Sequence, residues 1–239
     1  MSEANIGEIT INRRFNGPPD SAHGGYLCGL IAPLLGGTAE VTLRRRPPLD
    51  TPLEVARSDG VLALREGNTL IAEAAPASVM EIEPPPPVTF AQAEAASRSY
   101  EGFRRHSFDT CFVCGPQRPA GDGLRIFPHW VAGRDVVAAP WVPAASLAGE
   151  DGAVRPEFVW AALDCPGAWA FLAEAGDGRP IVLGRFAAEV AAPVYPGERY
   201  VVTGWRLGVD GRKMYAGTAL HTADGELRAR ARATWIRLA

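Results

Sequence analysis

Two short segments of the sequence carry residue types that could do chemistry together. Gly24 and Gly25 follow His23 at the start of an apolar run with helical spacing. Their amides should therefore lie unpaired at a helix N-terminus, where they can stabilise a developing negative charge. Asp164 lies within a second apolar run, where an unpaired carboxylate is costly and where burial would raise its pKa toward that of a useful base.

Each of these features also has a structural explanation. A Gly-Gly pair at a helix start permits tight packing. The Asp164 carboxylate could cap a backbone amide near Pro166, where the helix is interrupted. His23 fits a hydrogen-bonded structural residue better than an acid or a base.

The four cysteines raise the question of a metal site. Cys111 and Cys114 have the spacing of zinc ligands, and His106 and His129 lie nearby in the sequence. A structural zinc site needs four ligands, and the chain has no second pair of cysteines or histidines at ligand spacing. Cys28 and Cys165 fall on two predicted helices, where core positions are expected. We therefore predict no metal site, and a structural turn before the strand at Gly123.

The elements that must position these residues occur in the same order in both halves. In the first half, the pattern predicts a strand over 8–15, a turn over 17–22 and a helix over 23–37. Three strand-like stretches follow over 39–46, 53–64 and 69–80, with turn signals at Asp59-Gly60 and Gly67-Asn68. In the second half, the pattern predicts two strands over 123–130 and 135–142 and a helix over 155–176. Four strands follow over 182–192, 199–207, 213–222 and 226–238. In the last strand, small apolar residues and Trp235 alternate with charged residues, which indicates a half-buried strand.

A run of prolines at 84–87, followed by a polar, alanine-rich stretch, indicates a connector between the halves. We predict an N-terminal domain over 1–83, a connector over 84–107 and a C-terminal domain over 108–239. Each domain is expected to be a curved antiparallel sheet wrapped around one central helix, so the fold class is α+β.

Composition excludes several classes of partner. The 239 residues include 24 basic and 27 acidic side chains, for a net charge of −3, which gives no electrostatic reason to expect nucleic acid or a membrane surface as a partner. The longest apolar run, at 136–148, is short and contains two prolines, and the first residues lack the pattern of a signal peptide. We expect a cytoplasmic protein with reduced thiols.

The layout resembles the double hotdog fold of acyl-CoA thioesterases, and four segments carry the resemblance. The segment HGGYLCGLIA (23–32) is similar to the start of the central helix of these enzymes. The segment CFVCGPQRPAGDGLRIF (111–127) resembles the CFxCG…GL opening of small hotdog thioesterases. RPEFVWAALDCPGAW (155–169) resembles the family's helix, in which a catalytic aspartate follows the HGG histidine by about nine residues, as Asp164 follows Arg155. APVYPGERYVVTGW (192–205) resembles the strand–turn–strand after that helix.

The resemblance implies one composite site. The first helix has HGG but Ala32 at the aspartate position, and the second has Asp164 but begins Arg155-Pro156-Glu157. In related dimers the glycine amide and the acidic residue come from opposite subunits, so a fused chain can keep one complete site. By this resemblance Gly24 and Gly25 would bind the oxyanion, and Asp164 would activate water or attack directly. His23 would orient the substrate, and Asn16 would position water.

The expected substrate is an acyl-CoA thioester, with coenzyme A as part of the substrate and no separate cofactor. The residues expected to bind it are Asp20, Tyr26, Arg46, Arg155 and Trp160. Arginines at 44–46 and 104–105, with His106, could hold the phosphates of coenzyme A, although a solvated sheet edge also explains most of them. Because hotdog sheets often pair further, a homo-oligomer is also expected.

One departure from the family leaves other functions open. Thioesterases of the thioesterase II type pair their aspartate with a glutamine and a threonine or serine, where this chain has Leu183 or Val182 and Ala233. Either a simpler aspartate–glycine site operates, or the protein is a non-catalytic module that binds an acyl ligand or mediates assembly. A hydratase or dehydratase using Asp20 and His23 is a third hypothesis.

Overall fold

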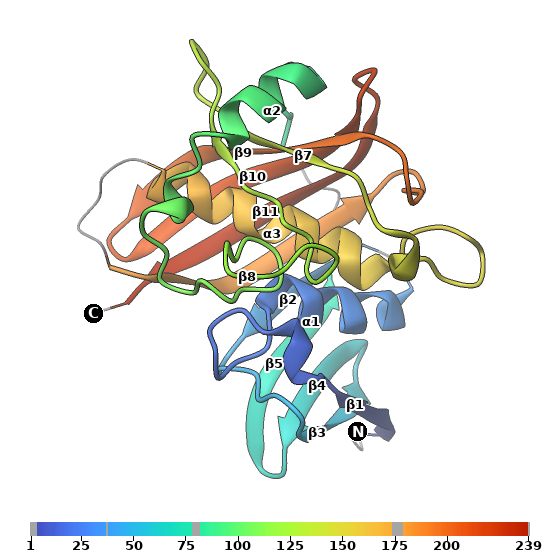
Figure 1. Ribbon diagram of the computed structural model, residues 1–239. Helices are drawn as coiled ribbons and strands as arrows, with labels where there is room; N and C mark the ends of the chain where they lie inside the picture. The colour runs from blue at the N-terminus through green and yellow to red at the C-terminus, as the bar shows by residue number, and fades with distance from the viewer. Residues whose placement is uncertain (1–3, 37, 78–81, 174–178, 239) are drawn as a thin grey trace.

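A computed structural model describes residues 4–36, 38–77, 82–173 and 179–238 (Figure 1). The strands among them are β1 (Ala4–Thr10), β2 (Ala39–Leu43), β3 (Pro52–Ser58), β4 (Val61–Glu66), β5 (Thr69–Pro76), β6 (His129–Trp130), β7 (Val137–Trp141), β8 (Ile181–Val190), β9 (Tyr200–Asp210), β10 (Lys213–Thr222) and β11 (Leu227–Arg237). The helices are α1 (Gly24–Ile31), α2 (Phe90–Ser97) and α3 (Pro156–Leu172), with short 3-10 turns at Arg13–Phe15, Ala32–Leu35, Glu101–Phe103 and Ala145–Leu147.

The strand order shows that one layout occurs twice. The described strands form a single sheet in the order β1-β3-β4-β5-β2-β8-β11-β10-β9-β7-β6. If β7 to β11 are matched in turn with β1 to β5, both halves have the same order, read from opposite ends. Each central helix also occupies the same place, α1 between β1 and β2 and α3 between β7 and β8. The predicted internal repeat and the α+β class are therefore confirmed.

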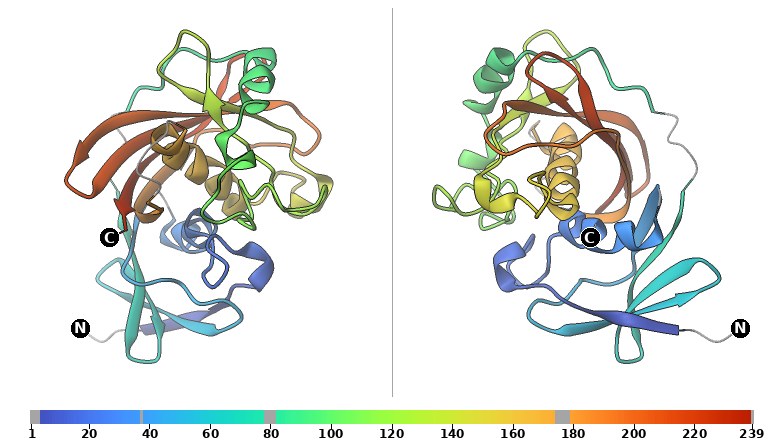
Figure 2. Two further views of the ribbon diagram at one scale, coloured as in Figure 1. Left: turned by 60° about the vertical axis from the view of Figure 1, so that its left-hand side comes forward. Right: turned by 90° about the vertical axis from the view of Figure 1, so that its right-hand side faces the viewer.

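The two halves join along β2 and β8, which pair antiparallel. Val41 lies opposite Phe186 and both are fully buried, so the seam is part of the core. The sheet of the second half curves around α3, and α1 lies against α3 on the side toward the first half (Figure 2). This arrangement brings the N-terminal end of α1 beside the middle of α3.

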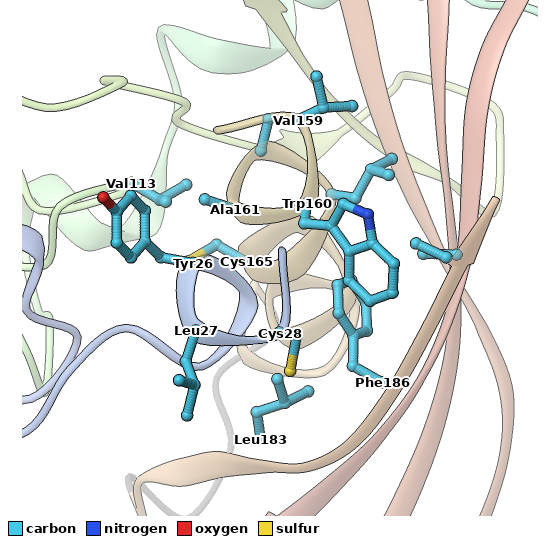
Figure 3. Packing of buried hydrophobic residues seen from close by; sticks show 14 of the residues in the cluster. Tyr26, Leu27, Cys28, Val113, Val159, Trp160, Ala161, Cys165, Leu183 and Phe186 are labelled. Carbon is cyan, nitrogen blue, oxygen red and sulfur yellow. The ribbon is translucent and has the colours of Figure 1, made fainter. Parts of the chain in front are cut away.

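Helix α3 is buried along most of its length, because apolar or small side chains cover nearly every side of it. Trp160 packs edge-on against Phe186 of β8 with ring centroids 5.6 Å apart, while Cys28 of α1 points toward Leu183 (Figure 3). A charged residue on such a helix has no route to solvent unless a cavity reaches it. No helix in the described parts of the chain is long and apolar enough to cross a membrane.

Several predicted boundaries differ from the structure. The predicted stretch 53–64 is a hairpin, because Asp59 and Gly60 both adopt positive φ and reverse the chain. The predicted strand 8–15 ends at Thr10, and the predicted strand 123–130 is reduced to β6. The first helix ends at Ile31 and continues as the turn Ala32–Leu35, which contains Pro33. The ends of the predicted strand 69–80 and helix 155–176 lie partly outside the described residues.

The connector contains a helix that was not predicted. The Thr89 side chain accepts a hydrogen bond from the Gln92 amide, and the Gln92 side chain accepts one from the Thr89 amide, so α2 begins with a capping box. Ala93 and Ala96 of this helix pack with Val131 and Val136, in the turn between β6 and β7, and with Val201 of β9. The connector is therefore part of the packed structure.

Candidate active site

The N-terminus of α1 meets α3 at Gly25 and Asp164. The Gly25 amide donates a hydrogen bond to Asp164 Oδ2 at 2.7 Å. A Cβ atom on Gly25 would lie 2.6 Å from Asp164 Cβ and 2.9 Å from the carbonyl oxygen of Trp160, so only glycine fits at this approach. The pair links residues 139 positions apart and comes from the two halves of the repeat, as the composite site requires.

Asp164 is 2% exposed and its second carboxylate oxygen is not engaged. Oδ1 has no hydrogen-bond partner among the described residues, although it is fully buried. Burial raises the pKa of Asp164 to about 6, while the neighbouring His23 and the Gly25 amide oppose that rise. A carboxylate with one anchored oxygen and one free oxygen is suited to accept a proton from a molecule in the adjoining cavity.

His23 caps α1 and contacts Asp164 from the side. Its Nδ1 lies 3.3 Å from the Tyr26 amide and 3.4 Å from Asp164 Oδ2, and its Nε2 lies 3.3 Å from Cys165 Sγ. Burial lowers the pKa of His23, but the Asp164 carboxylate and Cys111 outweigh it, and the net pKa is raised. Both ring nitrogens thus face protein atoms, which places His23 as a residue that positions Asp164.

Gly24 is the glycine that faces the cavity. Its amide makes no hydrogen bond to any residue that the structure describes, whereas the Gly25 amide is occupied by Asp164. The prediction that both amides bind an oxyanion is therefore corrected: in this arrangement only the Gly24 amide is available. A free amide at a helix N-terminus next to a buried carboxylate is the geometry needed for attack on a carbonyl carbon.

A cavity of about 370 Å³ opens beside this pair. Its inner part is lined by apolar side chains from α3, β8, β10 and β11: Ala168, Trp169, Leu172, Ile181, Leu183, Met214 and Trp235. Arginines also line it, from the loop after β2 and from more distant segments: Arg44, Arg45, Arg46, Arg105, Arg179 and Arg237. Most of these arginines are exposed, so the cavity has an apolar interior and a positively charged entrance.

Several residues predicted for the site lie outside this cavity. The Asn16 side chain donates to the carbonyl oxygen of Gly17 at 3.0 Å and to Thr110 Oγ1 at 3.2 Å, and accepts from Arg118, so it ties two loops together. Tyr26 stacks on Phe15 with centroids 4.2 Å apart in the aromatic core. Neither side chain is among those that line the cavity.

The predicted substrate-binding residues on α3 and in the loop before α1 also lie outside the cavity. Trp160 faces β8 in the core, and Arg155 lies at the start of α3, over the ring of Phe158 at 4.8 Å and beside Glu157. Asp20 is exposed and pairs with Arg46 at 3.2 Å. Of the five predicted substrate-binding residues, only Arg46 lines the cavity.

The apolar residues that shape the inner cavity were not predicted as site residues from the sequence. Trp235 lies on the buried face of β11, and the predicted alternation of that strand is confirmed, so this position could have been found from the pattern. Met214 and Arg237 depend on strand register and had no local signal. Cys165 is buried in the core, as predicted, and it also lies between His23 and Cys111.

Solved structures of similar length have the same fold. A candidate thioesterase II from Thermobifida fusca has a TM-score of 0.62 and 14% identity, covering 100% of this chain and 96% of that chain. The tesB protein of Mycobacterium avium subs paratuberculosis gives 0.61 and 12%, covering 100% and 96%, and a candidate oleoyl thioesterase from Lactobacillus plantarum gives 0.60 and 10%, covering 100% and 97%. No family model matches the chain, and no curated protein matches it in sequence.

These likenesses cover the whole chain at low identity, and they establish its fold. The chain is a double hotdog protein, as its strand order independently indicates.

Proposed function

We propose that the protein hydrolyses acyl-CoA thioesters at the Gly24–Asp164 site. The observation that carries this proposal is that the free Oδ1 and the free amide belong to Asp164 and Gly24, two residues that line the same cavity. The full-length likeness to proteins described as thioesterases supports the same class of reaction.

The reaction follows from the positions of these groups. The thioester carbonyl oxygen accepts a hydrogen bond from the Gly24 amide, and the helix dipole adds to the stabilisation. A water molecule attacks the carbonyl carbon while Asp164 Oδ1 takes its proton. The tetrahedral intermediate then collapses, the carbon–sulfur bond breaks, and the proton passes to the departing thiolate. The products are a carboxylic acid and a free thiol, and Asp164 returns to its charged form.

The arginines at the entrance support coenzyme A as the thiol. Guanidinium groups bind phosphate oxygens in a bidentate manner, and coenzyme A carries phosphates at the end remote from its sulfur. The apolar inner cavity would then hold the acyl chain. Arg46 and Arg105 are well placed for this role, since both are exposed and line the cavity.

The test is the release of free thiol from a panel of acyl-CoAs with short, long and aromatic acyl groups. We expect Asp164→Asn to lower kcat by at least roughly 100-fold, because the amide cannot accept the water proton. The matched control is Glu157→Gln, which changes another acidic residue of α3, in its first turn, where Arg155 is its partner and no contact with the cavity is made. This control should keep wild-type turnover and should fold equally well.

Two results would contradict the proposal. Equal turnover by wild type and Asp164→Asn would remove Asp164 from the chemistry. No thiol release from any substrate, by a protein that nevertheless binds an acyl-CoA, would favour the non-catalytic binding module. The hydratase hypothesis loses its basis, because Asp20 points away to Arg46 and does not line the cavity with His23.

A further inference from the structure

A cluster of thiol and imidazole groups lines the cavity next to Asp164, and its thiols play no part in the reaction above. Cys111, Cys114 and Cys165 are buried and none forms a disulfide. The Sγ atoms of Cys111 and Cys165 are 3.9 Å apart, and His23 Nε2 is 3.3 Å from Cys165 Sγ. The ligand atoms of His23, Cys111 and Cys165 all lie within 4.8 Å of one another.

These separations match the edges of a metal-centred tetrahedron. With zinc bonds of about 2.3 Å to sulfur and about 2.0 Å to nitrogen, tetrahedral angles place two sulfurs about 3.8 Å apart and a sulfur and a nitrogen about 3.5 Å apart. The separations of Cys111 from Cys165 and of His23 from Cys165 differ from these values by only a few tenths of an ångström. The indication of a ligand set is that a ring nitrogen and two thiols from three distant segments converge within 4.8 Å of one another.

Cys114 supplies a fourth donor. The turn from Cys111 to Cys114 is closed by the Gly115 amide, which donates to the Cys111 carbonyl oxygen at 2.9 Å. A Cβ atom on Gly115 would lie 2.5 Å from the Cys111 backbone, so the turn requires glycine. Cys114 lies outside the group whose ligand atoms are all within 4.8 Å of one another, so its side chain must shift toward that group to complete a four-ligand site.

The hydrogen bonds distinguish the two histidines. His106 Nδ1 accepts a hydrogen bond from the Phe108 amide at 2.8 Å, which leaves its proton on Nε2, directed at Cys114 Sγ at 3.3 Å. His106 therefore suits a donor to a metal-bound sulfur. His23 Nδ1 also accepts a hydrogen bond from a backbone amide, that of Tyr26 at 3.3 Å, so without a metal its proton lies on Nε2, directed at Cys165 Sγ. Unlike His106, it also has a carboxylate beside Nδ1, Asp164 Oδ2 at 3.4 Å, which would hold the proton on Nδ1 when Nε2 binds a metal.

We propose that Cys111, Cys114, Cys165 and His23 bind one Zn²⁺ ion in a closed structural site. The ion would join the loop before β6 to the start of α1 and the middle of α3, three segments far apart in the sequence. Asp164 Oδ2 and His106 would support the site from outside it. The proposal does not depend on the thioesterase activity, because a closed four-ligand site leaves no position for substrate.

The first test is the metal content of the wild-type protein, purified under reducing conditions without a metal-affinity step, by mass spectrometry. We expect close to one zinc per chain. Cys111→Ala and Cys114→Ala should lose most of it. The matched control is Cys28→Ala, which removes a buried cysteine of α1 that lies outside the cluster, and it should retain its zinc.

A second measurement on the wild type keeps the test independent of whether the variants fold. After removal of zinc by a chelator, addition of Co²⁺ should produce the charge-transfer and d–d absorption of a tetrahedral thiolate site, and Tm should recover. The proposal is overturned if the wild type, both as purified and after incubation with zinc, holds no more metal than Cys111→Ala. A disulfide between Cys111 and Cys165 in freshly purified protein would overturn it as well.

Discussion

Gly25 has two roles at one position, since its amide anchors Asp164 and its missing side chain makes room for it. We expect Gly25→Ala to lower kcat by roughly 100-fold, because a Cβ atom 2.6 Å from Asp164 Cβ would push the carboxylate from its place. Overpacking should also lower stability by about 1–3 kcal/mol. Thiol-release kinetics and denaturant unfolding measure the two effects.

Gly29→Ala is the control for that prediction. Gly29 lies on the same helix, and a Cβ atom there would meet Glu157 Cα of α3 at 2.5 Å, a comparable clash that does not involve Asp164. This variant should lose similar stability but retain most of its turnover. Equal losses of turnover in both variants would show that packing, and not the placement of Asp164, explains the effect of Gly25→Ala.

From the sequence, the residues of the site could be predicted, but the separate role of each backbone amide could not. Asp164 and Gly25 were predicted to share a site because each half of the repeat lacks what the other has. The occupation of the Gly25 amide by Asp164 could not be predicted, because it depends on how closely α1 and α3 approach. Cys165 is a core residue as predicted, but its contacts with His23 and Cys111 could not be predicted, since both are far away in sequence.

Among the elements, β11 determines how much room an acyl chain has. Trp235 is 5% exposed and lines the apolar part of the cavity. We expect Trp235→Ala to shift the kcat/KM preference toward longer acyl chains by roughly tenfold, because the removed indole leaves space for several methylene groups. The measurement is kcat/KM over a series of acyl-CoAs of increasing chain length.

Trp205→Ala separates this effect from a loss of stability. Trp205 is a buried tryptophan of β9 that packs with Ile82, Ala187 and Ala219, away from the cavity. Either substitution should lower stability by about 3–5 kcal/mol, as is usual for a buried tryptophan. Only Trp235→Ala should change the order of substrate preference, and a similar change in Trp205→Ala would refute the assignment.

The elements could be predicted where their signal was local. The strands that end each half follow from alternation and turn residues, and the central helices follow from apolar spacing. The helix α2 was missed because its polar, alanine-rich composition was taken as evidence for a connector, although Thr89 and Gln92 form a capping box. The hairpin at Asp59 and Gly60 carried a turn signal that the prediction of one stretch over 53–64 did not use.

At the scale of the whole molecule, one continuous sheet joins the two halves across β2 and β8. Ion pairs of Glu40 with Arg185 at 3.4 Å and Arg232 at 3.5 Å cross this seam on its outer side, where each contributes at most about 1 kcal/mol. The buried pair of Val41 and Phe186 belongs to the core and contributes through apolar burial. The parts of the site therefore meet within one chain.

Mixing two inactive variants tests this arrangement. If Gly25→Ala and Asp164→Asn proteins are combined, we expect no recovery of thiol release, because each chain carries one defect in its only Gly25–Asp164 pair. Co-expression followed by kinetics, with each single variant as the reference, is the measurement. Recovery would mean that halves exchange between chains, so that an intact α1 of one chain meets an intact α3 of another.

The seam between β2 and β8 also changes how this protein can evolve and be engineered. When a site is shared by two identical subunits, every substitution appears twice, so a gain at one site can be a loss at its twin. In this chain Ala32 is equivalent to Asp164 and Glu157 is equivalent to Gly25. A substitution at Ala32 or Glu157 therefore leaves Gly25 and Asp164 unchanged. New contacts, or a second binding function, could thus be introduced around Ala32 and Glu157 while the existing cavity keeps its residues.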